Sequence, residues 1–235
     1  MTHRQFSRTK LDLWLECPRC FYDDIVLGLG RPSGPPFTLN IAVDALFKAE
    51  FDGYRAAGKP HPLFATVGLD AIPFQHSQMA TWRSNFKGIR WTEPKSGWTF
   101  FGAVDDLWQK PDGSLIVVDY KATAKADEIT VQNIYPGYKR QLEMYQFLFE
   151  QAGYEVDARS WLVYANGIKN LGVFNDVLRF RTRMIPVDCD RSWVDAAFRE
   201  AAALLDGGER PPAAEECDWC RYALQKSAHG PEPNE

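Results

Sequence analysis

The stretch IVVDYKATAK, from Ile116 to Lys125, decides the fold and raises the first question about function. Its apolar start is typical of an interior β-strand. Asp119 and Lys121 then follow in the same segment, although charged side chains are rarely buried without a partner. Because residues two apart on a strand point to the same face, we expect these two side chains to lie together on one side of a sheet.

Strand and helix patterns alternate on both sides of this stretch. The turn Pro111-Asp112-Gly113 favours a hairpin that joins it to the preceding strand. Strands are predicted over 98–110, 114–123, 158–167 and 176–188, and helices between Ser7 and Pro18 and over 38–58, 74–86, 138–153 and 192–208. This order predicts an α/β fold with a mixed central sheet flanked by helices.

Length and composition indicate an ordinary globular protein. The chain has 235 residues, 45% of them hydrophobic and 25% charged, which predicts one domain over residues 1–225 and a polar tail over 226–235. No apolar run approaches the ~20 residues that span a membrane, and no apolar leader indicates export, so we expect a cytoplasmic protein without a membrane partner. The net charge of −4 excludes coating of nucleic acid by global charge but allows a local basic groove.

Asp105 lies on the strand before the turn, where the hairpin can bring it close to Asp119. Two carboxylates in a partly buried site repel each other unless a cation lies between them, and oxygen ligands suit Mg²⁺ or Mn²⁺. The ammonium of Lys121 beside such an ion can orient a water molecule or stabilise charge on a phosphate. The alternative is a surface ion pair that contributes less than ~1 kcal/mol.

Gln141 and Tyr145 are four residues apart on the next predicted helix and therefore share a face. An amide and a phenol there can contact a phosphate or a base. The alternative is a structural pair without contact to a ligand.

The cysteines form two matching pairs, Cys17-x-x-Cys20 and Cys217-x-x-Cys220. Each pair can present two thiolates to one metal, and together they predict a four-sulfur site for Zn²⁺ or an iron–sulfur cluster. Such a site joins the two ends of the chain as a clasp whose binding energy supports folding.

Three motifs in order carry a resemblance to a known family: GAVDDLW (102–108), VVDYKAT (117–123) and QLEMY (141–145). They resemble the motifs of the PD-(D/E)XK nuclease superfamily, in its RecB-like branch with the CRISPR-associated RecB-type exonucleases. The resemblance implies metal-dependent phosphodiester hydrolysis. It assigns metal binding to Asp105 and Asp119, water positioning to Lys121, and nucleic-acid contact to Gln141 and Tyr145.

The resemblance also bears on the cysteines. Relatives in the RecB-like branch often carry a [4Fe–4S] cluster that ties the first helix to the C-terminus, and Cys17, Cys217 and Cys220 match that layout. The fourth cysteine of the family, expected beyond Cys220, is missing, and Cys20 takes its place. Because paired Cys-x-x-Cys is also a usual zinc arrangement, the sequence is consistent with either Zn²⁺ or an iron–sulfur cluster.

A third acidic ligand is predicted on the helix over 38–58. RecB-like nucleases commonly place a metal-binding His on an early helix, and the corresponding stretch here contains Asp44. At 100° per residue Asp44 falls within the apolar arc of this helix, so its carboxylate needs a partner. We expect it to complete an all-oxygen site with Asp105 and Asp119; the alternative is a cap or a pair with an arginine such as Arg31.

Two functions follow as expectations. The first is a nuclease that acts on DNA, from an end or on single strands, in repair, recombination, phage or CRISPR-type processing. The second is a catalytically idle module of nuclease fold that binds nucleic acid or a partner protein in a repair or CRISPR-type complex. The acidic positions and Lys121 favour the first, and the acidic overall charge keeps the second open.

Overall fold

The computed structural model describes residues 4–229, which divide into two compact units. The sheet unit consists of residues 36–91 and 101–192, and the cysteine unit of residues 4–35, 92–100 and 193–229. The single domain over 1–225 stays a prediction. Residues 226–229 of the predicted tail belong to a helix, and 230–235 lie outside the described residues. No helix in the described part of the chain combines the length and apolar character needed to cross a membrane.

The sheet unit is built on a mixed five-stranded sheet in the order β2–β5–β6–β7–β8. Strands β6 and β7 are parallel, and the other neighbouring pairs are antiparallel. The strands are β2 (Ile72–Pro73), β5 (Asp106–Gln109), β6 (Leu115–Thr123), β7 (Arg159–Gly167) and β8 (Phe180–Asp188). The predicted α/β fold with a mixed sheet is confirmed.

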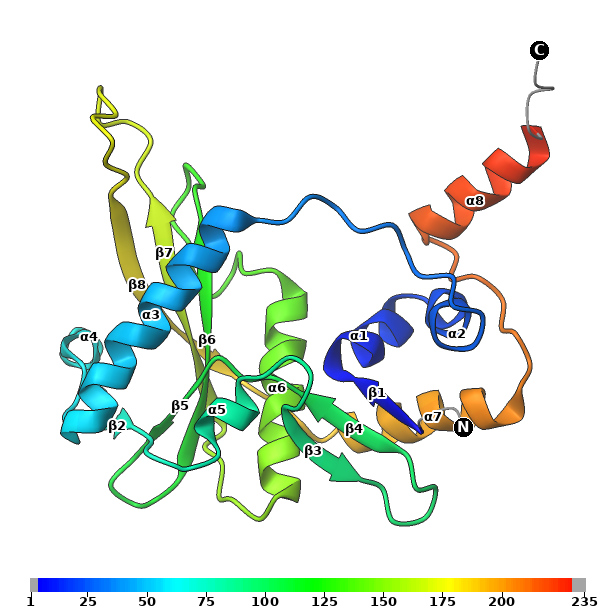
Figure 1. Ribbon diagram of the computed structural model, residues 1–235, viewed down its shortest axis with the longest axis horizontal. Helices are drawn as coiled ribbons and strands as arrows, with labels where there is room; N and C mark the ends of the chain where they lie inside the picture. The colour runs from blue at the N-terminus through cyan, green and yellow to red at the C-terminus, as the bar shows by residue number, and fades with distance from the viewer. Residues whose placement is uncertain (1–3, 230–235) are drawn as a thin grey trace. The chain divides into compact units, whose positions relative to one another are not determined.

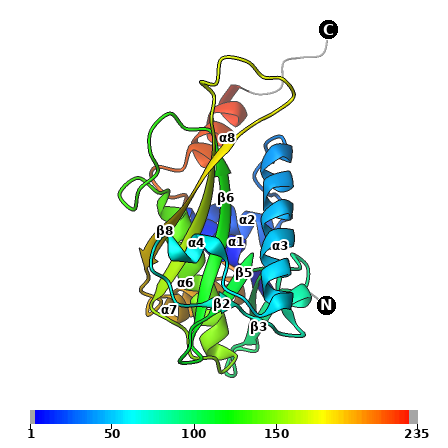
Figure 2. The same ribbon diagram turned by 90° about the vertical axis from the view of Figure 1, so that its left-hand side faces the viewer.

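Two long helices cover opposite faces of this sheet (Figure 1). Phe47 of α3 (Thr38–Ala57) stacks on Tyr120 with ring centroids 5.1 Å apart. Gln141 of α6 (Pro136–Gln151) donates a hydrogen bond to Asp119. Because Asp119 and Tyr120 are consecutive on β6, their side chains point to opposite faces. Figure 2 shows α3 alongside its face of the sheet.

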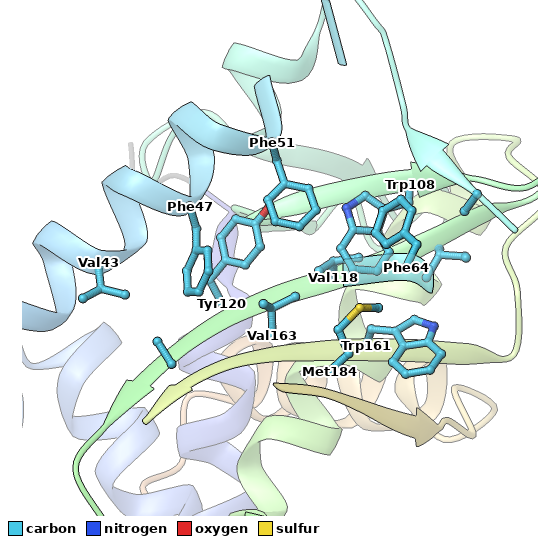
Figure 3. Close-up of a cluster of buried hydrophobic side chains, with 13 residues drawn as sticks. Val43, Phe47, Phe51, Phe64, Trp108, Val118, Tyr120, Trp161, Val163 and Met184 are labelled. Carbon is cyan, nitrogen blue, oxygen red and sulfur yellow. The ribbon is translucent and has the colours of Figure 1, made fainter. Parts of the chain in front are cut away.

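An aromatic core fills the space between α3 and the sheet (Figure 3). Phe51 stacks on Trp108 with centroids 5.5 Å apart, and Phe64 of the short helix α4 (Pro62–Ala65) packs against the same indole at 4.4 Å. Burial of such rings contributes ~1.5–3 kcal/mol each. Helix α3 ends at Ala57 and is capped by Gly58, whose φ of 61° is the left-handed conformation that favours glycine at this position.

Two predicted elements differ from the structure. Of the helix predicted over 74–86, only the single turn α5 (Met79–Trp82) is helical. The predicted start of the helix extends the edge of the sheet instead, because the backbone N–H of Phe74 donates to the carbonyl of Leu107. The strand over 98–110 divides into β4 (Thr99–Gly102) and β5, which belong to different sheets. The N–H of Val104 donates to the carbonyl of Trp82 and so leaves the strand ladder between them.

The cysteine unit is mainly helical. Its elements are β1 (Gln5–Ser7), α1 (Arg8–Glu16), α2 (Pro18–Val26), α7 (Val194–Gly207) and α8 (Asp218–His229). A second sheet has the order β1–β4–β3, with β3 spanning Ile89–Thr92. The tip of the β3–β4 hairpin belongs to this unit, and there Thr99 donates to the carbonyl of Arg4. The sequence patterns did not predict α2 or α8.

A buried charge cluster connects α3 to the sheet. Asp106, the first residue of β5, is 0% exposed and pairs with Arg55 of α3 and with Arg83, whose Nη2 lies 2.9 Å from Oδ1. The hydroxyl of Tyr120 donates to Oδ2 of Asp106 at 2.6 Å. These partners compensate the buried carboxylate, because a buried charge without a counter-charge is strongly destabilising.

We expect Asp106→Asn to lower the free energy of unfolding by about 3–5 kcal/mol, because it removes the buried counter-charge of Arg55 and Arg83 and leaves them only the half-exposed carboxylate of Asp52. Urea denaturation followed by circular dichroism measures the change. Asp70→Asn is the matched control, since Asp70 is exposed and surface substitutions usually change stability by less than ~0.5 kcal/mol. Equal unfolding midpoints for the two variants would contradict this role of Asp106.

Candidate active site and cysteine site

The candidate active site begins where β6 loses one of its two neighbouring strands. β5 starts at Asp106 opposite Val118, so the following residues of β6 pair only with β7. The N–H of Tyr120 on the open side donates instead to Oδ2 of Asp105 at 3.0 Å. The structure therefore places the carboxylate of Asp105 beside β6, next to Asp119.

Asp119 and Lys121 point to the α6 face of β6, as the two-residue spacing predicts. The Lys121 ammonium forms an ion pair with Oδ2 of Asp119. Gln141 donates through Nε2 to Oδ1 of Asp119 at 2.6 Å, and its Oε1 accepts from Lys121 at 3.4 Å. The ammonium also lies 4.5 Å from the ring centroid of Tyr138, a cation–π distance.

The two carboxylates have opposite pKa shifts. Burial raises the pKa of Asp119 to about 7; Lys121 opposes this rise, and the negative charge of Asp105 adds to it. Burial also acts to raise the pKa of Asp105, but the ammonium groups of Lys48 and Lys121 and the N–H of Tyr120 hold it below its usual value. The site therefore favours one more positive charge beside Asp119.

Asp44 lies at the same site, on α3. Its Oδ2 accepts from Lys48 Nζ at 2.7 Å, and the same Nζ lies 3.0 Å from Oδ1 of Asp105. Burial and the charge of Asp105 raise the pKa of Asp44. The alternative partner Arg31 pairs instead with Glu16 at 2.6 Å. Asp44 and Asp105 thus already converge on one positive charge.

The three predicted carboxylate ligands do not form one close set: within residues 4–229, only the four cysteines place three or more metal-binding atoms within 4.8 Å of one another. Metal binding by these carboxylates therefore stays a prediction. Asp44, Asp105 and Asp119 offer only oxygen donors, as Mg²⁺ and Mn²⁺ prefer. Two ammonium groups lie among them, Lys48 and Lys121, and a positive ion of higher charge meets the same electrostatic demand.

Tyr145 is 3% exposed and reaches the site through Gln141, whose Nε2 lies 3.5 Å from the phenol oxygen. Direct contact of Tyr145 with nucleic acid stays a prediction.

Sequence reasoning missed Lys48 and Tyr138. The spacing Asp44-x-x-x-Lys48 is the signal that could have found Lys48, because residues four apart share a helix face; no comparable pattern identifies Tyr138.

The four paired cysteines come together in the cysteine unit. Cys17 lies between α1 and α2, and Cys217 directly precedes α8. The Sγ atoms of all four cysteines lie within 4.8 Å of one another. The Sγ atom of Cys20 lies 3.5 Å from that of Cys217 and 3.6 Å from that of Cys220. The predicted link between N- and C-terminal segments is confirmed as an arrangement of thiols that could bind a metal.

Two donors point at these sulfurs. Arg31 approaches Cys217 Sγ at 3.6 Å, and the N–H of Ala214 donates to Cys17 Sγ at 3.4 Å. Positive charge and N–H donors favour thiolates, which are the metal-binding form of cysteine.

Comparison with known proteins identifies the family. No curated protein matches the chain. A solved structure, the crystal structure of SSO0001, aligns over 97% of this chain and 88% of that chain with 15% identity and a TM-score of 0.45. The model of the PD-(D/E)XK nuclease superfamily matches residues 38–224, which include both the carboxylate site and the second cysteine pair. The chain therefore belongs to the PD-(D/E)XK nuclease superfamily.

Proposed function

We propose that the protein is a Mg²⁺- or Mn²⁺-dependent nuclease that hydrolyses phosphodiester bonds of DNA at ends or in single strands. Membership of the superfamily supports a nuclease. The observation that carries the proposal is the meeting of Asp105, Asp119 and Lys121 at the open edge of β6. A RecB-like, cytoplasmic role in repair, recombination, phage or CRISPR-type processing remains part of this proposal.

The roles follow from the contacts. Asp44, Asp105 and Asp119 would hold the divalent ion, which supplies Lewis-acid stabilisation of the phosphate and lowers the pKa of a bound water. Lys121, held by Asp119, directs its positive charge at the phosphate that is attacked. Gln141 keeps Asp119 and Lys121 in position through its two hydrogen bonds.

The second candidate is an idle module of nuclease fold that binds nucleic acid or a partner protein of a repair or CRISPR-type complex. The net charge of −4 favours it, because tight unaided binding of DNA needs several phosphate contacts. Cleavage assays separate the two candidates.

For the cysteine site we propose a single Zn²⁺. Four thiolates at about 2.3 Å from one tetrahedral zinc lie about 3.8 Å apart, and three of the sulfur pairs here are separated by 3.5, 3.6 and 3.8 Å. In a [4Fe–4S] cluster each thiolate binds a different iron, so the sulfurs spread around a larger body. The cluster is the alternative outcome of the test below.

Asp119→Ala and Lys121→Ala should each slow metal-dependent cleavage at least about a hundredfold, because each removes charge stabilisation of several kcal/mol from the transition state. Labelled single- and double-stranded DNA and RNA are incubated with Mg²⁺, with Mn²⁺ or with EDTA. Asp70→Ala and Lys59→Ala, at exposed positions of the same unit, are matched controls. Wild-type rates in both site variants would show that the site is misplaced, and no cleavage by the wild type would favour the idle module.

Asp44→Ala should weaken metal affinity and activity together, because it removes one oxygen ligand. Asp44→His should retain activity and shift the preference from Mg²⁺ towards Mn²⁺, since imidazole suits the softer ion. Titration of the cleavage rate with each metal measures both effects. A metal dependence in Asp44→Ala identical to that of the wild type would make Asp44 a structural residue.

Cys17→Ser and Cys217→Ser should lower the melting temperature and release the bound metal, because the ligands join segments 197 to 203 residues apart. Cys189→Ser, outside the cluster, is the matched control. Metal analysis and visible absorption after anaerobic purification identify the metal: a colourless protein with one zinc supports our proposal, and a brown protein with iron and sulfide supports the cluster. If the purified protein contains neither zinc nor iron, the proposal of a metal-bound clasp is contradicted.

A further inference from the structure

Four cations gather where β7 and β8 are joined, outside the candidate active site. Lys125, Lys169 and Arg181 line a cavity of about 230 Å³, and Arg179 precedes β8. We call these four residues the basic cluster. All four side chains are exposed, and among residues 4–229 none of them has a hydrogen-bond or ion-pair partner.

Strand register places part of the basic cluster on the face that carries the active site. Lys121 of β6 pairs with Tyr164 of β7, and two residues further along both strands Thr123 pairs with Asn166. Asn166 in turn pairs with Arg181 of β8. Cross-strand partners share a face, and strands lie ~4.8 Å apart, so Arg181 projects from the α6 face about 10 Å from the β6 backbone.

The hairpin between β7 and β8 ends in an exposed aromatic residue. Phe174 is 70% exposed, and its carbonyl accepts from Val177 N–H at 2.9 Å across a tight turn. The central residues Asn175 and Asp176 have φ of 42° and 56°, which Asn and Asp tolerate better than most residues. Figure 1 shows this hairpin, in yellow, extending beyond the neighbouring strands.

The chemistry of both features matches one class of ligand. Unpaired cations on a chain of net charge −4 concentrate local positive charge where polyanions can bind. An exposed phenylalanine offers a stacking surface for a base, and every unpaired base has a face that can stack. A single strand of nucleic acid supplies phosphates and unpaired bases together, whereas an acidic protein segment supplies only the charge.

We propose that the β7–β8 hairpin binds a single strand of nucleic acid, with the basic cluster on its phosphates and Phe174 against one of its bases. The strand then continues along the α6 face towards Asp119 and Lys121. This proposal deepens the proposed function and rests on it for the direction of the strand.

The test measures binding without added divalent metal, so its result does not depend on cleavage. Fluorescence anisotropy with labelled 20-nucleotide single-stranded DNA, single-stranded RNA and duplex DNA is recorded at several salt concentrations. The variants of the full chain are Lys169→Ala/Arg181→Ala and Phe174→Ala. The charge-matched control is Lys59→Ala/Lys87→Ala, at two exposed lysines of the same unit, and thermal melts confirm that all variants fold.

We expect the double variant to bind single strands at least tenfold more weakly and to reduce the salt slope by about 1.4, since each lost phosphate contact removes about 0.7. Phe174→Ala should weaken single-strand binding about fivefold to a hundredfold and leave duplex binding unchanged. Preference between the DNA and RNA strands identifies the ligand.

Three results would overturn the proposal. The first is no binding by the wild type, and the second is binding by both hairpin variants equal to that of the control. The third is displacement of the labelled strand by poly-glutamate as readily as by unlabelled strand, which would indicate an acidic protein partner. Failure of the proposed function is recognised separately, because a protein that binds through the hairpin but cleaves nothing keeps this inference and loses the nuclease.

Discussion

The sheet unit depends on the buried charge of Asp106. This carboxylate accepts from Arg83 and Tyr120 and pairs with Arg55 of α3, so one side chain connects a helix, a loop and two strands. Because loss of a partner from a buried ion pair is strongly destabilising, these contacts stabilise the observed arrangement of the four elements. The start of β5 is fixed with them.

The active site follows from where β5 starts. Asp105 immediately precedes the anchored residue, and Arg83 Nε also holds its carbonyl at 2.8 Å. With β5 absent beyond Val118, the edge of β6 is open, and a side-chain carboxylate takes the hydrogen bond that a strand would otherwise accept. The same opening lets Asp44 and Lys48 approach from α3. The position of β5 thereby brings Asp105 close both to Asp119 and to the ion pair of Asp44 with Lys48.

Charge balance connects this site with its proposed ligands. Carboxylates bind a metal but repel a phosphate, so a polyanionic substrate requires cations around them. Lys48 and Lys121 lie within the site, and the basic cluster lies on β8 and on the loops that follow β6 and β7. In the cysteine unit, a different interaction brings distant segments together: four thiols, rather than an extensive core, join α1 and α2 to the start of α8.

The sequence by itself determined the elements whose pattern is local. The apolar strand patterns over 114–123 and 158–167 predicted β6 and β7, and the patterns over 38–58 and 138–153 predicted α3 and α6. The order of the motifs indicated the nuclease family. Only the tertiary structure decided that 98–110 divides between two sheets, that Asp106 is a buried anchor and that Lys48 joins Asp44 to Asp105. The reason is physical. A local pattern of apolar residues indicates which face of a segment is buried. The role of a charged residue depends instead on counter-charges that folding brings from segments tens of residues away, as it brings Arg55 to Asp106.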